Sequence, residues 1–267
     1  MSAPSLLVLD FDGVVCDGMT EFFQSAWLAW PLATGMALPD DRRDELRARF
    51  AQLRPAVESG WEMALLPALL AARDPHDDVS LEDEWGAARD SLLARYDVAP
   101  RTLADALDAA RDAWIRRDAS GWLRCHRFYP GIADWLRGLL DAKQLVYVLS
   151  TKDKRFLDEL LEWQRVALPS AQVIGKETPR QPKWAVIQAL IDAHGLPRTG
   201  HGTWFVEDRL QTLTDLRVDA PHLAGMRLFL ATWGYVFPRD VARAAEVAGA
   251  RALRLAEATG PFSAWPR

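Results

Sequence analysis

Residues 5–18, "SLLVLDFDGVVCDG", take an apolar run directly into two acidic residues. The run at residues 6–9 is typical of a buried parallel strand, and Asp10 and Asp12 follow where such a strand would end. Two carboxylates so close together repel each other unless a cation lies between them or one keeps a proton. A solvated turn at the end of the strand is the plainer alternative. The segment predicts a strand whose carboxyl end carries a functional site.

The composition is that of an ordinary globular protein. Of the 267 residues, 49% are hydrophobic and 26% are charged, which is enough to bury a full core. The net charge of -5 argues against a general electrostatic surface for nucleic acid, so we expect no nucleic-acid partner. Cys16 and Cys125 are the only cysteines and have neither metal-ligand spacing nor a disulfide framework. That usage is typical of a reducing cytoplasm.

Two further features favour a cytoplasmic protein that does not enter a membrane. The N-terminus has no positively charged segment of the kind that begins a secretory signal. The longest uncharged run, residues 22–39, contains Pro31 and Pro39 and predicts a helix, a break and a loop. We therefore expect no membrane span there.

The periodicity of the chain changes twice. Residues 20–128 carry apolar residues at helical spacing, whereas short apolar strands alternate with helices after Tyr129. The strands expected there are residues 145–149, 172–174, 203–206 and 227–230. Alternating strands and helices predict an α/β fold with a Rossmann-like parallel sheet, to which the first strand also belongs. We therefore expect a core domain of residues 1–17 and 129–267, interrupted by an all-α domain of residues 18–128.

Polar side chains follow each of these strands. Ser150 and Thr151 come after the second strand, Lys183 comes beyond the third, and Glu207 and Asp208 come after the fourth. The carboxyl ends of parallel strands share one edge of the sheet, so these side chains should gather near the first two aspartates.

That set of groups suits phosphoryl chemistry. Mg²⁺ prefers oxygen ligands such as the carboxylates of Asp10 and Asp208. Lys183 and Ser150 offer a positive charge and a donor to phosphate oxygens. A carboxylate nucleophile would divide a difficult hydrolysis into two easier steps.

Several of these residues have a plainer interpretation. Ser150 could be the N-cap of the helix that begins near residue 153. Lys183 could be a surface lysine. Glu207 and Asp208 could simply cap the helix that follows them.

The segments "LDFDGVV", "VLSTK", "QPKW" and "FVEDR" resemble, in order and context, the four motifs of the haloacid dehalogenase-like (HAD) hydrolase superfamily. "YPGIADWLRGLL" and "AGMRLFLATWGY" resemble its phosphoglycolate-phosphatase-like members. The all-α insertion lies where that family has its first-type helical cap domain. The resemblance implies a HAD fold with a cap.

The resemblance also implies a role for each acid of the first segment. Asp10 would be the nucleophile and a Mg²⁺ ligand. Asp12 would be the general acid and base, with its backbone carbonyl on the metal.

The other motif residues would handle the phosphoryl group and the metal. Ser150 would donate a hydrogen bond to the phosphoryl group, and Lys183 would neutralise its charge. Asp208 would be an inner-sphere metal ligand, with Glu207 in the outer shell.

This chain departs from the pattern at three places. Its second motif reads Ser-Thr-Lys where Ser or Thr followed by Asn is more usual, so Thr151 is a rival for the phosphate donor. The lysine of "QPKW" lacks the common following proline, which leaves Lys176 as an alternative to Lys183. The next acid after "VEDR" is Asp215, which is too distant to be a preferred ligand.

The leading functional hypothesis is a Mg²⁺-dependent phosphatase acting on a small phosphorylated metabolite. The cap would select the substrate, and Arg54 and Glu58 are candidates, although their i,i+4 spacing also suits a surface pair. The alternatives are a phosphomutase of the β-phosphoglucomutase type and a catalytically silent HAD-fold binding protein. The oligomeric state is left open, with a monomer as the default.

Two related activities are disfavoured. The cap contains no lysine, which a phosphonate hydrolase of this superfamily needs for its Schiff base. A dehalogenase would lack the second aspartate of the first motif, which is present as Asp12.

Overall fold

The computed structural model describes residues 3–74, 76, 78–176 and 181–266. The chain divides into two compact units. We call Met1–Asp17 with Arg127–Arg267 the core unit, and Gly18–His126 the helical unit. The second junction lies two residues earlier than residue 128 because Arg127–Phe128 forms a strand, β3, that pairs with β2 at Cys16–Asp17.

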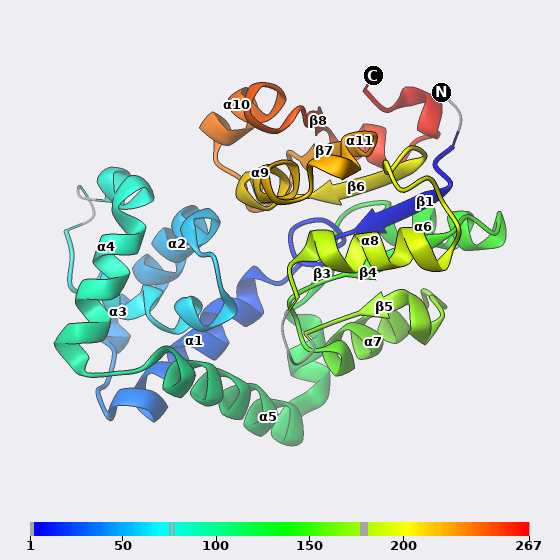
Figure 1. The fold of residues 1–267 in the computed structure, drawn as a ribbon. Coiled ribbons are helices and arrows are strands. Elements are labelled where there is room, and N and C mark those ends of the chain that lie inside the picture. Colours follow the sequence, from blue (N-terminus) through cyan, green and yellow to red (C-terminus); the bar gives the residue numbers. More distant parts are fainter. Residues whose placement is uncertain (1–2, 75, 77, 177–180, 267) are drawn as a thin grey trace. The chain divides into compact units, whose positions relative to one another are not determined.

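The core unit contains a six-stranded sheet in the order β5-β4-β1-β6-β7-β8, and each neighbouring pair is parallel (Figure 1). Its strands are β1 (Leu6–Leu9), β4 (Val146–Leu149), β5 (Val173–Ile174), β6 (Thr203–Glu207), β7 (Arg227–Ala231) and β8 (Arg251–Leu253). The five strands expected from the sequence are present within one residue of their predicted bounds. The predicted α/β, Rossmann-like parallel sheet is confirmed.

Helices cover the sheet in the core unit. They are α6 (Ile132–Asp141), α7 (Lys154–Trp163), α8 (Lys183–Ala193), α9 (Leu210–Asp219), α10 (Pro238–Ala248) and α11 (Leu255–Ala258). Helices α8, α9 and α10 pack on one face, against Leu6, Val8 and Phe205, which alternate with residues that point to the other face. Fully buried strands such as β1 explain the continuous apolar run in the sequence.

Aromatic rings fill much of the other face. Trp265, in the C-terminal segment, lies with its ring centroid 4.9 Å from that of Phe229 and 5.3 Å from that of Trp204. Phe262 and Trp135 of α6 complete the cluster at 5.5 and 6.1 Å from Trp265. These contacts bind the end of the chain to the centre of the sheet.

The described residues of the helical unit form five α-helices. They are α1 (Met19–Thr34), α2 (Arg43–Leu53), α3 (Leu66–Ala71), α4 (Asp78–Tyr96) and α5 (Pro100–Arg124). Helix α1 continues through Pro31 and ends at Thr34, where Gly35 caps it in a left-handed conformation with φ 71°. Helix α5 is kinked at Asp118. Among the described residues, no helix is long and apolar enough to cross a membrane.

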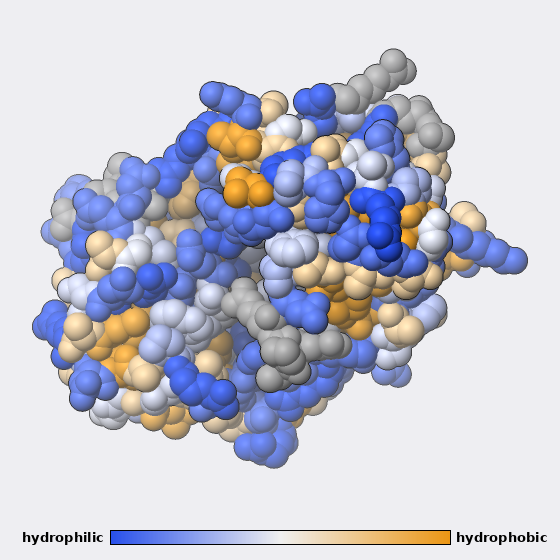
Figure 2. Space-filling view, viewed as in Figure 1, coloured by the Kyte–Doolittle hydropathy of each residue, from blue (hydrophilic) through white to orange (hydrophobic). Residues whose placement is uncertain are grey.

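Hydrophilic side chains dominate the visible face of the molecule, and apolar ones form small patches (Figure 2). The exposed large hydrophobic side chains among the described residues are Leu32 and Met36 at the end of α1, and Trp163 and Val218 elsewhere. Scattered residues of this kind are normal on a globular protein.

Candidate active site

Three neighbouring strands of the core unit lead into polar side chains at one edge of the sheet. Asp10 follows β1, Ser150 follows β4, and Glu207 ends β6 with Asp208 directly after it. Strand β1 lies between β4 and β6, and the amide of Asp10 still donates to the carbonyl of Val206 at 2.9 Å. All four polar side chains belong to buried residues at the carboxyl edge, which is where open parallel sheets bind ligands.

Lys183 connects two of these strand ends. It is the first residue of α8, and its Nζ donates to Oδ1 of Asp10 at 2.7 Å and to Oε2 of Glu207 at 2.6 Å. Only 15% of its side chain is exposed, so it is not a plain surface lysine. Lys176, its rival in the sequence, is exposed.

The acids at this edge form a compact cluster. Asp10, Glu207 and Asp208 each offer a carboxylate oxygen within 4.8 Å of the others. Oε1 of Glu207 accepts from the amides of Asp208 and Arg209, both at 3.2 Å, so this side chain also serves the start of α9. Oδ2 of Asp208 accepts from the amide of Tyr235 at 2.7 Å. Buried carboxylate oxygens of this kind are the ligands that Mg²⁺ prefers.

Burial and charge shift the pKa values of the central pair. The pKa of Asp10 is raised from 3.8 to about 7, because burial and the nearby charge of Glu207 together outweigh the opposing effect of Lys183. Burial lowers the pKa of Lys183, but Asp10 and Glu207 outweigh that effect and raise it above its ordinary value. Three carboxylates and one lysine leave excess negative charge at the site, which a divalent cation would neutralise.

Two glycines allow Asp208 to reach the cluster. Gly13 has φ 88°, and a Cβ at this position would overlap the carboxylate of Asp208. A Cβ on Gly234 would overlap the carbonyl oxygen of Gly13 and would lie 2.5 Å from Cβ of Asp208. The backbone must therefore approach closely on both sides of this carboxylate.

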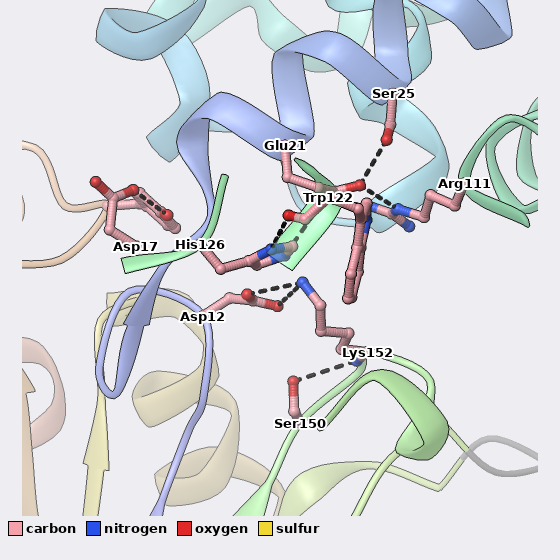
Figure 3. A network of polar contacts seen from close by, with 10 residues as sticks. Asp12, Asp17, Glu21, Ser25, Arg111, Trp122, His126, Ser150 and Lys152 are labelled. Carbon is pink, nitrogen blue, oxygen red and sulfur yellow. Dashed lines mark hydrogen bonds and ion pairs between the residues drawn. The ribbon is translucent and has the colours of Figure 1, made fainter. Parts of the chain in front are cut away.

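Asp12 has a different partner from Asp10. Its Oδ1 and Oδ2 lie 3.1 and 3.4 Å from Nζ of Lys152, a residue that is only 7% exposed (Figure 3). The sequence prediction used this segment only for Ser150 and Thr151 and missed Lys152. The available signal was its position, since a residue just beyond a buried strand lies at the same edge as the predicted site.

The structure distinguishes the two hydroxyls after β4. Ser150 is buried, and its Oγ accepts from the amide of Lys152 at 3.2 Å, whereas Thr151 is exposed. The N-cap of α7 is Asp153, whose side chain accepts from the amide of Arg155. Ser150 therefore does not cap the helix, and it is better placed than Thr151 to serve the site.

Aromatic residues surround the loop that carries Asp12. Tyr235 donates through its hydroxyl to Oδ1 of Asp17 at 2.8 Å, and Trp233 donates through Nε1 to the carbonyl of Val14 at 3.1 Å. Tyr129 meets Trp233 edge to face, and burial raises the pKa of its phenol. Sequence reasoning assigned no role to these residues, although they lie in the re-entry and late segments that carried the resemblance.

The helical unit contains its own buried polar network. Glu21 accepts from Arg111 Nε at 2.7 Å, from Arg111 Nη2 at 3.2 Å and from the hydroxyl of Ser25 at 2.5 Å (Figure 3). Glu21 and Ser25 belong to α1 and Arg111 to α5. The network therefore joins two helices that are far apart in the sequence.

The predicted substrate contacts also belong to the helical unit. The guanidinium of Arg54 lies over the ring of Phe22 at 5.3 Å from its centroid. Glu58 is exposed, and its amide donates to Oε2 of the buried Glu62 at 2.8 Å. A role for Arg54 and Glu58 in substrate binding stays a prediction.

No family model and no curated protein matches the sequence. Solved structures do match the fold. A predicted phosphatase from Clostridium acetobutylicum is 16% identical with a TM-score of 0.58, over 95% of this chain and 94% of that chain. A haloacid dehalogenase-like family hydrolase from Streptococcus pneumoniae is 14% identical with a TM-score of 0.55, over 91% of this chain and 92% of that chain. A predicted phosphoglycolate phosphatase from Haemophilus somnus is 15% identical with a TM-score of 0.58, over 91% of this chain and 92% of that chain.

These alignments cover nearly the full length of each chain, so they include the helical insertion as well as the sheet. TM-scores above 0.5 at such low identities show similarity of fold alone. The chain therefore has the same fold as these solved haloacid dehalogenase-like and phosphatase structures, with the helical insertion included.

Proposed function

We propose that this protein is a Mg²⁺-dependent phosphatase that hydrolyses a phosphate monoester of a small metabolite through an aspartyl-phosphate intermediate. One observation carries the proposal. The buried carboxylates of Asp10, Glu207 and Asp208 converge with Lys183 at the carboxyl edge of a HAD-type sheet. Excess buried negative charge beside a lysine suits a divalent cation and a phosphate group.

The donor set fits Mg²⁺. Asp10, Asp208 and the backbone carbonyl of Asp12 would hold the ion, and Glu207 would support it from the outer shell. The bound ion would offset the negative charge of these carboxylates and of the substrate phosphate.

The protein's own groups then account for both chemical steps. A carboxylate oxygen of Asp10 attacks phosphorus as the bond from phosphorus to the leaving oxygen breaks, and Asp12 gives that oxygen a proton. In the second step water attacks the same phosphorus and Asp12 takes the proton, which releases phosphate and restores Asp10. Lys183 neutralises the phosphoryl oxygens, and Ser150 donates a hydrogen bond to them.

The helical unit would act as the cap that selects the substrate. Arg54 and Glu58 are the proposed contacts there. Alanine variants at these two positions should change the order of preference among phosphorylated metabolites without abolishing turnover of all of them.

The test of the proposed function is phosphate release from a panel of phosphorylated metabolites, with Mg²⁺ and with chelator. Wild-type protein should release phosphate only with Mg²⁺, and Asp10→Asn should be inactive. Asp215→Asn is the matched control, because Asp215 is exposed on α9. Its carboxylate accepts a hydrogen bond from the side chain of Gln211, on the same helix. Absence of release from every substrate by a folded wild-type protein would refute a phosphatase.

The same assay separates the alternatives. A phosphomutase would move phosphate between positions of a sugar and would require a sugar bisphosphate, with no net release. A silent binding protein would bind a phosphorylated ligand without converting it.

A further inference from the structure

Lys152 is a buried lysine whose charge has a specific partner. Its side chain is 3% exposed, and Nζ lies within 3.4 Å of both carboxylate oxygens of Asp12, whose side chain is 16% exposed (Figure 3). Lysines are almost never buried to this degree unless they are paired. The contact spans 140 residues of sequence, so local helix or turn geometry does not produce it.

The backbone of Lys152 is also held by hydrogen bonds. Its amide donates to Oγ of Ser150 at 3.2 Å, and its carbonyl accepts from the amide of Lys176 at 2.8 Å. Gly175 packs against the same segment so closely that a Cβ there would lie 2.8 Å from the carbonyl oxygen of Lys152. One residue therefore contacts two groups of the candidate site, the carboxyl of Asp12 through its side chain and the hydroxyl of Ser150 through its backbone.

We propose that Lys152 is a positioning residue that fixes the carboxyl of Asp12 for proton transfer to the leaving oxygen. This inference rests on the proposed function, since it gives Lys152 a part only in that reaction. The two lysines pair with different carboxylates of the site. Lys183 contacts Asp10 and Glu207, whereas Lys152 contacts Asp12. Holding a side chain in one orientation matters because a displacement of about 1 Å can cost about 10²-fold in rate.

The test uses Lys152→Met, which keeps the length of the side chain and removes the charge. Turnover is measured with Mg²⁺ on a series of aryl phosphates whose leaving groups range from good (4-nitrophenol) to poor (phenol). A misplaced proton donor matters most for the poor leaving group, because a good one departs without a proton. We expect kcat to fall about 10²-fold on phenyl phosphate but less than about 5-fold on 4-nitrophenyl phosphate, with KM nearly unchanged.

A second variant shows whether Lys152 acts through Asp12. If it does, the Lys152→Met effect on kcat should disappear in an Asp12→Asn background, because the group that it positions is gone. Lys154→Met is the matched control: Lys154 is two residues away and pairs with Asp158 on the partly exposed face of α7. If Lys152→Met does not fold by circular dichroism, Lys152→Gln replaces it, with the same expected dependence on the leaving group.

The possible outcomes are distinct. An equal loss of kcat on every aryl phosphate, or a rise in KM alone, would mean that Lys152 contacts the phosphoryl group and would overturn the proposal. Additive losses in the double variant would overturn it as well. A folded wild-type protein that releases phosphate from no aryl phosphate and from no member of the metabolite panel would refute the proposed function itself, which separates the two failures.

Discussion

Lys183 donates to Asp10 at 2.7 Å although 173 residues separate them in the chain. The contact joins the first turn of α8 to the end of β1, and Glu207 accepts from the same ammonium group. A lysine placed between two buried carboxylates stabilises the metal-free fold and is also the group expected to meet the phosphate.

Removing this lysine should destabilise the protein. Lys183→Met leaves Asp10 and Glu207 buried without their cation, so we expect the free energy of unfolding to fall by about 3 kcal/mol. Urea denaturation in chelator measures the change. Lys176→Met is the control, because Lys176 is exposed, and an equal effect of both variants would contradict the argument.

Asp10 should make the stability of the metal-free protein depend on pH. Its pKa in the folded state is raised from 3.8 to about 7, so the folded protein holds a proton that the unfolded chain has already lost. Stability should therefore fall as pH rises from about 4 to about 7, by up to about 1.4 kcal/mol per pH unit.

The variant Asp10→Asn should lack this loss. Its free energy of unfolding in chelator should match that of wild type near pH 4 and exceed it by about 2 kcal/mol or more at pH 8. Added Mg²⁺ should stabilise wild type more than the variant. A difference between the two proteins that stays constant with pH would show that the site does not raise this pKa.

Gly234 should be needed for both stability and metal binding. A Cβ at this position would overlap backbone of Gly13 and crowd Asp208, so Gly234→Ala should cost about 1–3 kcal/mol and weaken Mg²⁺ binding measured by calorimetry. Gly138→Ala is the control, because Gly138 lies inside α6 with nothing within 4 Å of an added Cβ. That variant should be stabilised by up to about 1 kcal/mol, with unchanged Mg²⁺ binding.

The C-terminal aromatic cluster should be a major source of stability in the core unit. Trp265 is 2% exposed and touches rings of the sheet and of α6, so we expect Trp265→Ala to lower the free energy of unfolding by about 3–5 kcal/mol. Trp163→Ala is the matched control, since Trp163 is 40% exposed. Similar denaturation midpoints for the two variants would contradict a large contribution of this cluster to the stability of the core unit.

The Glu21–Arg111 pair should behave as a buried ion pair in the helical unit. Arg111→Met leaves the fully buried Glu21 without its main cation and should cost about 3–5 kcal/mol. Restoring neutrality with Glu21→Gln in the same chain should recover part of that loss. The exposed pair Arg101–Asp105 is the control, and Arg101→Ala should leave the denaturation midpoint nearly unchanged.

The strand ends of the core unit were predictable because two simple regularities apply to them. Buried parallel strands appear as continuous apolar runs, and their carboxyl ends share one edge. Asp10, Ser150, Glu207 and Asp208 could therefore be placed at one edge from the sequence.

Other features have no comparable signal in the sequence. Strands β2 and β3 are two residues long, and β8 is a three-residue edge strand with two exposed positions, so none shows a recognisable pattern. The partner of Lys152 depends on where a long flexible side chain ends in three dimensions. The role of Tyr235 at Asp208 belongs to its backbone amide, which is common to nearly all residue types.

The position of β1 in the sheet has a consequence for how the chain folds. This strand is synthesised first, yet its residue Leu7 pairs with Val146 and Trp204, which are synthesised much later. The whole helical unit leaves the ribosome before either neighbour of β1 exists, so that unit can collapse while β1 still lacks its sheet. Contacts of such long range slow folding and leave an apolar strand exposed in the meantime. The apolar strand β1 of the nascent chain therefore stays exposed until both of its neighbours have been synthesised.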